Sequence, residues 1–188
     1  FIDVLNNTPT NDLPCELEKV FNVNSFLLSM AFDILTGNWD GPLFNKNNFY
    51  LYHNPDRDWF EYIPYDLDNT FGIDWFGIDW ATRDIYAWGH PDEPRPLYSR
   101  IMEVPEYKKR FSFFMNQFMT EVYNETVLFP RLDALEAMLA PAVAEDMYYT
   151  LDYGFDTGDF SDGFLMALPY FHTKEGIKPF ITRRRTAS

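Results

Sequence analysis

Apolar residues recur at three- and four-residue steps in several stretches of the chain, and this spacing predicts amphipathic helices. The first predicted helix covers residues 13–21, with Asp12 as its N-cap and Pro14 in its first turn. A second helix begins near Ser25 and ends at Gly37, because glycine is favoured just past the last helical residue. The apolar face of this second helix consists of Leu27, Met30, Ala31, Ile34 and Leu35.

Two aromatic-rich runs, residues 48–52 and 59–63, have the composition of β-strands. The six residues between them, 53–58, are dense in turn formers, so we expect the two runs to pair as an antiparallel hairpin. Pro64 follows the second run directly, which suits the end of a strand better than its middle.

The second half of the chain has the pattern of helices. One helix follows Pro105, another is expected to open at Pro130, and Pro141 is expected to end or kink it. Residues 152–163 are rich in Asp and Gly and predict a loop, and residues 177–185 predict a terminal helix. The whole pattern predicts one helix-rich α+β domain over residues 1–188, with a single hairpin inserted early.

The charge of the chain is strongly acidic and unevenly placed. There are 15 Lys and Arg against 29 Asp and Glu, which gives a net charge of −14. Residues 56–93 contain ten acidic and two basic residues, and residues 132–173 contain eight acidic residues with no Lys or Arg. Such a surface repels nucleic acid and attracts cations and basic partners. The basic run at 183–185 is too short to change this balance, and we expect it to be a solvated helix end.

Two further counts exclude other classes of protein. Cys15 is the single cysteine, which excludes an internal disulfide and a cysteine-rich zinc site. No stretch approaches the roughly 18 consecutive apolar residues of a membrane-spanning helix, so no membrane span is expected.

Candidate chemistry gathers around the two ends of the predicted hairpin. Asp40 follows the helix stop at Gly37, Asn48 precedes the first strand, and Asp66 follows the second. The start of one antiparallel strand lies beside the end of its partner, so Asn48 and Asp66 are expected to be neighbours. Amide and carboxylate oxygens suit magnesium or manganese better than zinc.

Asp66 and Asp68 would point to one face if the second strand continued, and two like charges there would favour a bound cation or a proton. The alternative is that backbone N–H groups of an Asx-rich turn hold these carboxylates without metal. A calcium loop at 152–163 is a weaker possibility, because the spacing of its aspartates does not match the EF-hand pattern.

Several motifs, taken in order, make the chain resemble the CotH (spore-coat protein H) kinase family. The motifs are Gly-Asn-Trp-Asp at 37–40, Asn-Phe-Tyr-Leu-Tyr at 48–52, Ile-Pro-Tyr-Asp-Leu-Asp-Asn-Thr-Phe-Gly at 63–72, Val-Pro-Glu-Tyr at 104–107 and Ile-Lys-Pro-Phe-Ile at 177–181. The resemblance implies a fold similar to the C-terminal lobe of an atypical protein kinase. It also implies ATP-dependent phosphorylation of serine-rich proteins and an extracellular, cell-surface or spore-coat location in bacteria.

The resemblance also implies roles for the candidate residues. Asp40 would orient or deprotonate the attacking hydroxyl, while Asn48 and Asp66 would hold magnesium (or manganese) on the ATP phosphates. Asp68 would be a second metal ligand or support the first. Protein kinases have four residues between the catalytic Asp and the metal-binding Asn, whereas seven separate Asp40 from Asn48. Asn45 satisfies the four-residue gap, so the choice stays open, although Asn48 is preferred because it directly precedes the strand.

One part of a kinase is not found in the sequence. Residues 1–35 contain neither a Gly-rich phosphate loop nor a strand lysine, so we expect the lobe that grips the nucleotide to lie upstream of Phe1. We expect residues 1–188 alone to fold but not to phosphorylate the basic, serine-rich substrate that an acidic surface favours. The alternative function is a non-catalytic module for coat assembly or adhesion on the same fold.

Overall fold

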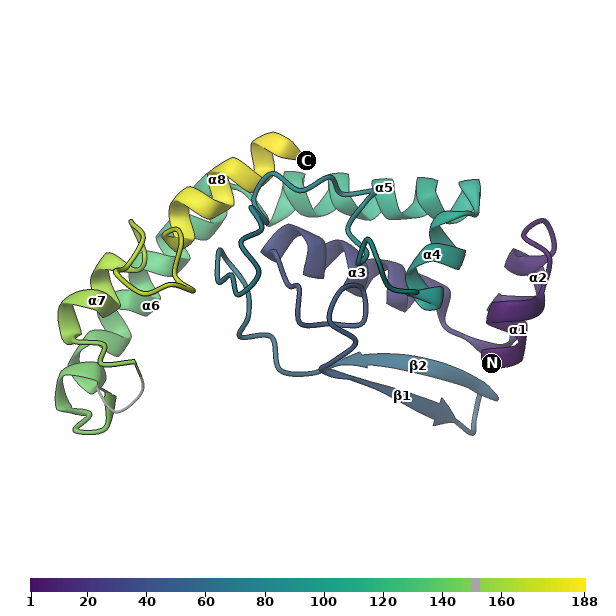
Figure 1. Cartoon of the computed structure of the whole chain (residues 1–188), viewed down its shortest axis with the longest axis horizontal. Helices are drawn as coiled ribbons and strands as arrows, with labels where there is room; N and C mark the ends of the chain where they lie inside the picture. The colour runs from purple at the N-terminus through teal and green to yellow at the C-terminus, as the bar shows by residue number, and fades with distance from the viewer. Residues whose placement is uncertain (150–152) are drawn as a thin grey trace.

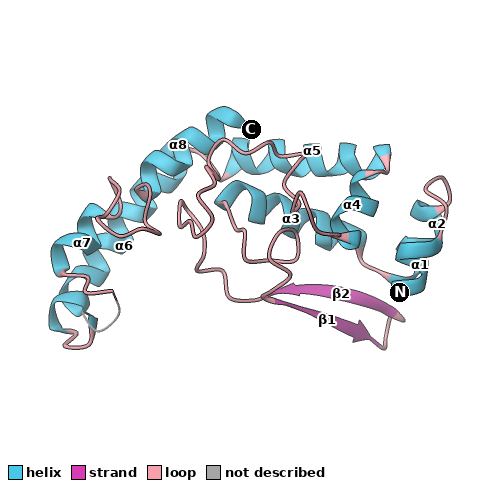
Figure 2. Ribbon diagram, in the orientation of Figure 1, coloured by secondary structure: helices cyan, strands magenta, loops and turns pink. Residues whose placement is uncertain are grey.

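The molecule is organised around one long apolar helix, α3 (Val23–Thr36), which packs mainly against the helix at residues 105–121 (Figures 1 and 2). The computed structural model describes residues 1–149 and 153–188. The remaining elements are α1 (Ile2–Asn7), α2 (Leu13–Val20), β1 (Phe49–Asn54), β2 (Trp59–Pro64), α4 (Pro96–Met102), α5 (Pro105–Glu121), α6 (Glu125–Glu145), α7 (Thr157–Asp162) and α8 (Ile177–Ala187). In Figure 1, α1 and α2 lie at one end of the molecule and α6 to α8 at the other, with the hairpin along one side of α3.

Helix α3 is fixed at both ends by its sequence. The Asn22 side chain accepts a hydrogen bond from the backbone N–H of Ser25 at 3.1 Å, so the helix begins two residues before the predicted start. Gly37 ends the helix as predicted, with a left-handed φ of 76°. A Cβ atom at this position would lie 2.5 Å from the ring of Phe180 on α8. Position 37 therefore requires glycine both for its backbone conformation and for its contact with α8.

The hairpin prediction is confirmed. Strands β1 and β2 pair antiparallel, from Phe49 opposite Pro64 to Asn54 opposite Trp59. Tyr62 is buried and meets the ring of Phe26 on α3 edge to face, with centroids 5.1 Å apart. The opposite side of the hairpin exposes Tyr50, Tyr52 and Ile63, whereas Leu51 pairs with Tyr62 and lies on the same side as that residue.

The prediction for Pro141 allowed an end or a kink, and the end is excluded because α6 continues to Glu145. The prediction that Pro130 opens this helix was wrong, because α6 already runs from Glu125. It begins instead at Asn124, whose side chain accepts from the Val127 N–H at 3.1 Å. None of its residues is buried, so water can satisfy the carbonyl groups that each proline leaves unpaired.

The expected loop at 152–163 contains the short helix α7. Asp156 and Asp159 form a capping box at its start, in which each side chain accepts a hydrogen bond from the other residue's backbone N–H. This capping supplies the local reason for a helix where glycine and aspartate predicted a loop. Asp152, which belonged to the same prediction, lies outside the described residues.

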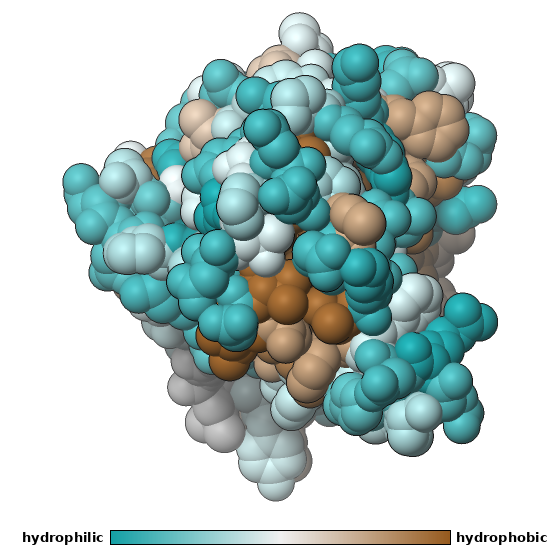
Figure 3. Space-filling model, turned by 90° about the vertical axis from the view of Figure 1, so that its right-hand side faces the viewer, coloured by the Kyte–Doolittle hydropathy of each residue, from teal (hydrophilic) through white to brown (hydrophobic). Residues whose placement is uncertain are grey.

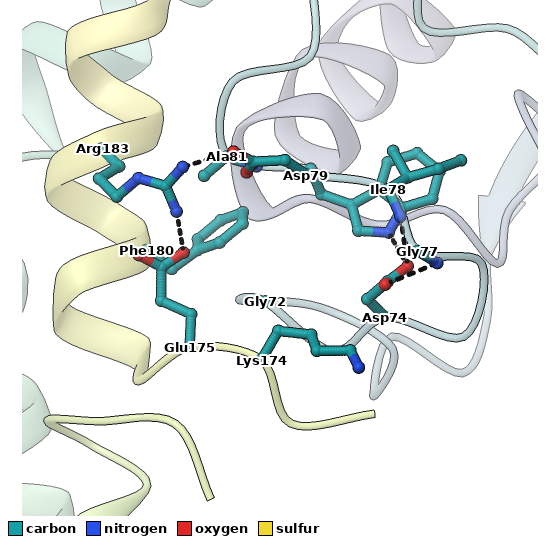
Figure 4. A pocket seen from close by; sticks show the side chains of 11 residues that line it. Gly72, Asp74, Gly77, Ile78, Asp79, Ala81, Lys174, Glu175, Phe180 and Arg183 are labelled. Atoms are coloured by element: carbon teal, nitrogen blue, oxygen red, sulfur yellow. Dashed lines mark hydrogen bonds and ion pairs between the residues drawn. The ribbon is translucent and has the colours of Figure 1, made fainter. Parts of the chain in front are cut away.

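A tandem Gly-Ile-Asp-Trp sequence at 72–80 shapes the loop that leads from the hairpin to α4. Asp74, in the first copy, is buried and accepts hydrogen bonds from three backbone N–H groups, at residues 76–78, and from the indole of Trp80. Asp79, in the second copy, pairs with Arg183 on α8, which also binds Glu175 at 2.9 Å (Figure 4). Asp74 therefore holds the loop through hydrogen bonds within it, and Asp79 holds the loop against α8.

The prediction of a solvated basic run at 183–185 was wrong for Arg184. This side chain is completely buried, and its Nη1 donates to the backbone carbonyls of Trp80 and Arg83. Its guanidinium lies over the ring of Trp88, 5.0 Å from the centroid, and burial lowers the pKa of Arg184 to about 10. The error has a simple cause, since Arg184 faces inward on α8 while its two neighbours pair at the surface.

Asp33 is a second buried charged group, on the inner face of α3. It is 2% exposed, and its Oδ1 accepts a hydrogen bond from the side chain of Asn38 at 3.1 Å. Burial raises the pKa of Asp33 to about 7, although the hydrogen bond from Asn38 acts in the opposite direction. Near neutral pH this carboxyl is therefore partly protonated in the folded protein.

The surface is largely polar in the one face that Figure 3 displays, where a small hydrophobic area is surrounded by hydrophilic residues. This face is the end of the molecule at which α1, α2 and the turn of the hairpin lie. Among the residues that the structure describes, no helix combines the length and the apolar character needed to cross a membrane.

Replacement of Arg184 tests the buried cation. We expect Arg184→Ala to lower the free energy of unfolding by about 3 kcal/mol, because it leaves a cavity and unpaired buried carbonyls. The matched change Arg185→Ala removes a surface pair with Glu125 and should cost less than about 1 kcal/mol. Urea denaturation of both variants measures the difference, and equal losses would contradict the role given to Arg184.

Replacement of Asp33 tests the buried carboxyl. The folded state holds the proton up to about pH 7, whereas the unfolded chain releases it at its ordinary pKa of about 3.9. The stability that this group contributes is full below pH 4 and is lost as the pH rises to 7. Asp33→Asn removes this loss, so the variant should gain about 1.4 kcal/mol over the parent for each pH unit in that window. Urea denaturation from pH 4 to 8 measures it, with exposed Asp92→Asn as the control that should run parallel to the parent.

Candidate active site

Asp40 lies at the centre of the polar residues that the sequence singled out. It follows the turn at Gly37, it is 8% exposed, and its backbone N–H donates to Oδ1 of Asn38 at 3.0 Å. The other end of the Asn38 side chain donates to the buried Asp33 on α3. The backbone of Asp40 is therefore connected to α3 through the side-chain amide of Asn38.

Three asparagine side chains hold the carboxylate of Asp40. Asn45 donates to Oδ1 at 2.6 Å, while Asn48 and Asn69 each donate to Oδ2 at 3.0 Å. In the described part of the chain, no Lys or Arg pairs with this carboxylate. All three donors are neutral, so they fix the orientation of Asp40 without cancelling its charge.

The structure brings together both candidates for the metal-side asparagine. Asn45 and Asn48 each bind Asp40, one at each carboxylate oxygen, so the four-residue gap and the seven-residue gap both reach the same group. Asn48 has a left-handed φ of 53°, which turns the chain from the Asp40 loop into β1. The side chain of Asn48 uses only its amide nitrogen on Asp40, and its carbonyl oxygen has no partner among the described residues.

Sequence reasoning missed the third asparagine. Asn69 comes from the loop after β2 and joins Asp40 from 29 residues further along the chain. The Asp-Leu-Asp-Asn sequence at 66–69 contains this amide directly after the two carboxylates that were predicted to bind metal. The missed group thus supplies the third amide of the cluster, and it connects the segment after the hairpin with the loop before it.

Asp66 and Asp68 take a different arrangement from the one expected. Strand β2 ends at Pro64, and Asp66 has a left-handed φ of 51°, so the two carboxylates do not continue one face of the strand. The backbone N–H of Tyr65 donates to the carbonyl of Asn48 at 3.0 Å, which places Asp66 next to the start of the hairpin, as expected. Both carboxylates are exposed, and within residues 1–149 and 153–188 neither has a hydrogen-bond or ion-pair partner in its side chain.

Hard-cation ligands at this site include groups other than carboxylates. Across the described residues, no three His, Cys, Asp or Glu side chains lie close enough together to hold a metal ion. The free carboxylates of Asp66 and Asp68 and the amide oxygen of Asn48 are nevertheless oxygen donors of the kind that magnesium accepts. A cation held there with few protein ligands would need further oxygens from a ligand or from water.

The chain is similar to a known family and to several named proteins. Residues 1–187 match the family described as CotH kinase protein. Inner spore coat protein H of Bacillus subtilis is 26% identical over 144 residues, which are 77% of this chain and 38% of that protein. Spore coat protein homolog 1 of Rhizopus delemar is 28% identical over 134 residues, which are 68% of this chain and 21% of that protein.

A further relative carries a different kind of name. Invasin CotH2 of Rhizopus delemar is 24% identical over 143 residues, which are 72% of this chain and 24% of that protein. The chain thus spans between 21% and 38% of the length of these three curated relatives. Because the family match extends over residues 1–187 of 188, the chain belongs to the CotH kinase protein family.

Proposed function

We propose that this chain is the catalytic lobe of an atypical protein kinase that transfers the γ-phosphate of ATP to serine or threonine in a protein. The observation that carries the proposal is the carboxylate of Asp40, held by Asn45, Asn48 and Asn69 at 2.6–3.0 Å in the loop between α3 and the hairpin. Protein kinases place a catalytic Asp, a metal-binding Asn, a hairpin and a metal-binding Asp in this same order along the chain.

Asp40 has the chemical properties of a group that orients a hydroxyl. Its Oδ1 accepts one hydrogen bond, from Asn45, and a carboxylate oxygen can accept more than one. The hydroxyl of the substrate would donate to this oxygen. As the hydroxyl oxygen attacks the γ-phosphorus, its proton would pass to Asp40 and the bond from that phosphorus to the bridging oxygen would break, so that ADP leaves. The three amides keep the carboxylate from rotating, so the acceptor oxygen is already in place when the substrate arrives.

The residues around Asp40 fit magnesium and ATP. Asp66 and Asp68 offer free, exposed carboxylates, and Asn48 offers the amide oxygen that its contact with Asp40 leaves unused. Magnesium is bound in many phosphoryl-transfer sites by one or two carboxylates together with phosphate oxygens of the nucleotide. When bound, it would neutralise charge on the phosphates. Asn48 would then connect the group that orients the hydroxyl with the group that holds the phosphate.

A second lobe outside these residues would complete the nucleotide site. Residues 2–36 form the helices α1 to α3, and neither a strand lysine nor a Gly-rich loop is among them. The exposed Tyr50, Tyr52 and Tyr65 beside the candidate site offer an apolar surface that such a lobe could cover. The acidic surface favours basic, serine-rich proteins as substrates, and the names of the relatives support a spore-coat or cell-surface location.

A non-catalytic surface module for adhesion or assembly is the alternative. The name of the relative Invasin CotH2 supports it, whereas the ordered amides around a charged, unpaired carboxylate support catalysis. A surface module would need no such carboxylate, so an experiment on Asp40 separates the two functions.

Asp40→Asn is the direct test of the catalytic proposal. In the full-length protein that contains these residues, we expect phosphoryl transfer to fall by a factor on the order of 10²–10⁴, the usual worth of a positioned acid–base group. The measurement is autophosphorylation and substrate labelling with radiolabelled ATP. Asp56→Asn in the hairpin turn is the matched control and should keep full activity. Unchanged labelling in the Asp40 variant, with its fold verified by circular dichroism, would overturn the assignment.

Manganese binding tests the metal ligands separately. We expect Mn²⁺ to broaden the NMR signals of Asp66, Asp68 and Asn48 first, weakly on its own and more strongly with an ATP analogue that supplies phosphate oxygens. Asp66→Asn should reduce the broadening, whereas Asp133→Asn on α6 should not. Broadening centred instead on Asp156 and Asp159 would move the cation to the acidic segment around α7.

A further inference from the structure

A cavity of about 450 Å³ adjoins the candidate active site. We call it the aromatic cavity; the lining residues that matter here are Trp39, Asp68, Asn69, Trp75, Phe155 and His172. Asn69 is the residue that donates to Oδ2 of Asp40, and Trp39 directly precedes Asp40 in the chain. A substrate side chain bound in the aromatic cavity would therefore be close in sequence to the residue whose hydroxyl approaches Asp40.

Aromatic side chains make up much of the wall of the aromatic cavity. Trp75 and His172 stack with centroids 4.9 Å apart and planes 10° from parallel, and Tyr153 lies 4.5 Å from His172. Trp75 is nevertheless 41% exposed, so part of its indole is accessible to a ligand. The face of an indole attracts cations more strongly than any other aromatic side chain.

The charges at the aromatic cavity are acidic. The carboxylate of Asp68 lines it, and Asp68 also lines a neighbouring cavity of about 420 Å³ together with Asp159 and Glu175. Neither cavity is lined by Lys or Arg among the described residues. Lys174, the nearest basic residue in sequence, lines the separate pocket that lies between Gly72 and Arg183 (Figure 4).

The two walls of the aromatic cavity are fixed to each other by backbone contacts. Ile73 and Thr173 form an antiparallel bridge, and the N–H of Asp74 donates to the carbonyl of His172 at 2.8 Å. The indole N–H of Trp39 donates to the carbonyl of Ile73 at 2.8 Å, which joins the same wall to the Asp40 loop. The cavity is therefore formed before any ligand binds, and its distance from Asp40 is set by the fold.

We infer that the aromatic cavity binds a lysine or arginine side chain of the protein substrate, next to the serine or threonine that receives phosphate. The inference rests on the proposed function, and it gives that function a local specificity. An apolar stem between aromatic rings, with a cationic end near the Asp68 carboxylate, matches the chemistry of these two side chains. The acidic surface as a whole would attract any basic protein. The aromatic cavity would instead select the position of a basic residue relative to the serine or threonine that receives phosphate.

The test uses peptide binding, measured separately from catalysis. Short peptides of Gly with one Ser carry a single Arg at each position from three before to three after the Ser, and matched peptides carry neutral citrulline instead. Isothermal titration calorimetry with the full-length protein, in EDTA and without nucleotide, keeps the metal ligands out of the measurement. We expect the best Arg peptide to bind about tenfold more tightly than its citrulline counterpart.

Two variants and two controls locate the effect. Trp75→Leu removes the indole face and should abolish the preference for Arg, and Asp68→Asn, an exposed change, should weaken it severalfold. Phe113→Leu on α5, 62% exposed, and Asp92→Asn should leave the preference unchanged. Circular dichroism verifies the fold, and if Trp75→Leu does not fold, Asp68→Asn alone decides.

The outcomes separate this inference from the proposed function. Equal binding of Arg and citrulline peptides at every position would overturn it, as would a preference that survives in Trp75→Leu and Asp68→Asn. A preference that these variants remove, in a protein that transfers no phosphate, would support the cavity and overturn the kinase proposal. Phosphate transfer by a protein that shows no preference for Arg over citrulline peptides would support the kinase proposal and overturn the inference about the cavity.

Discussion

The contact on which the candidate site depends is the set of three amide hydrogen bonds to one carboxylate. Asp40, Asn45, Asn48 and Asn69 come from the loop before the hairpin and the loop after it, and the hairpin itself separates them. The hairpin brings the two loops side by side, because β1 starts opposite the end of β2, and the shared acceptor then fixes them to each other. A charged acceptor also makes each bond stronger than one between neutral groups. The same three hydrogen bonds therefore orient the Asp40 carboxylate and join the two loops.

Other buried charged groups hold the remaining loops in the same way. Asp74 organises its loop by accepting four hydrogen bonds, and Arg184 holds the carbonyls of the segment that follows. Long loops in a helix-rich domain have many polar backbone groups that need partners. One buried side chain with several donors or acceptors can satisfy a whole turn. The aromatic rings around these groups then exclude water and raise the cost of losing any partner.

Sequence patterns predicted the parts of this structure that depend on neighbours along the chain. The hairpin and the stop at Gly37 follow from short-range signals and were confirmed. Asn69 was missed because its partner lies 29 residues away, although the Asp-Leu-Asp-Asn sequence at 66–69 offers an amide beside the two carboxylates. Arg184 was misread for a related reason, because a run of three basic residues looks solvated until the packing of α8 is known. The placement of Asp66 depended on where β2 ends, and a single left-handed residue changed it.

The contact between Gly37 and Phe180 has a consequence for how the protein is made. Phe180 lies on α8, the last helix of the described chain, and packs against the turn that leads into the Asp40 loop. During synthesis the residues of that loop leave the ribosome long before Phe180 does, and domains form as their last segments become available. The turn at Gly37 therefore lacks its contact with Phe180 until α8 has been synthesised. Phe180 and Ile181 on α8 are also part of the hydrophobic core, so a nascent chain would complete that core and the turn before the Asp40 loop at the same late stage.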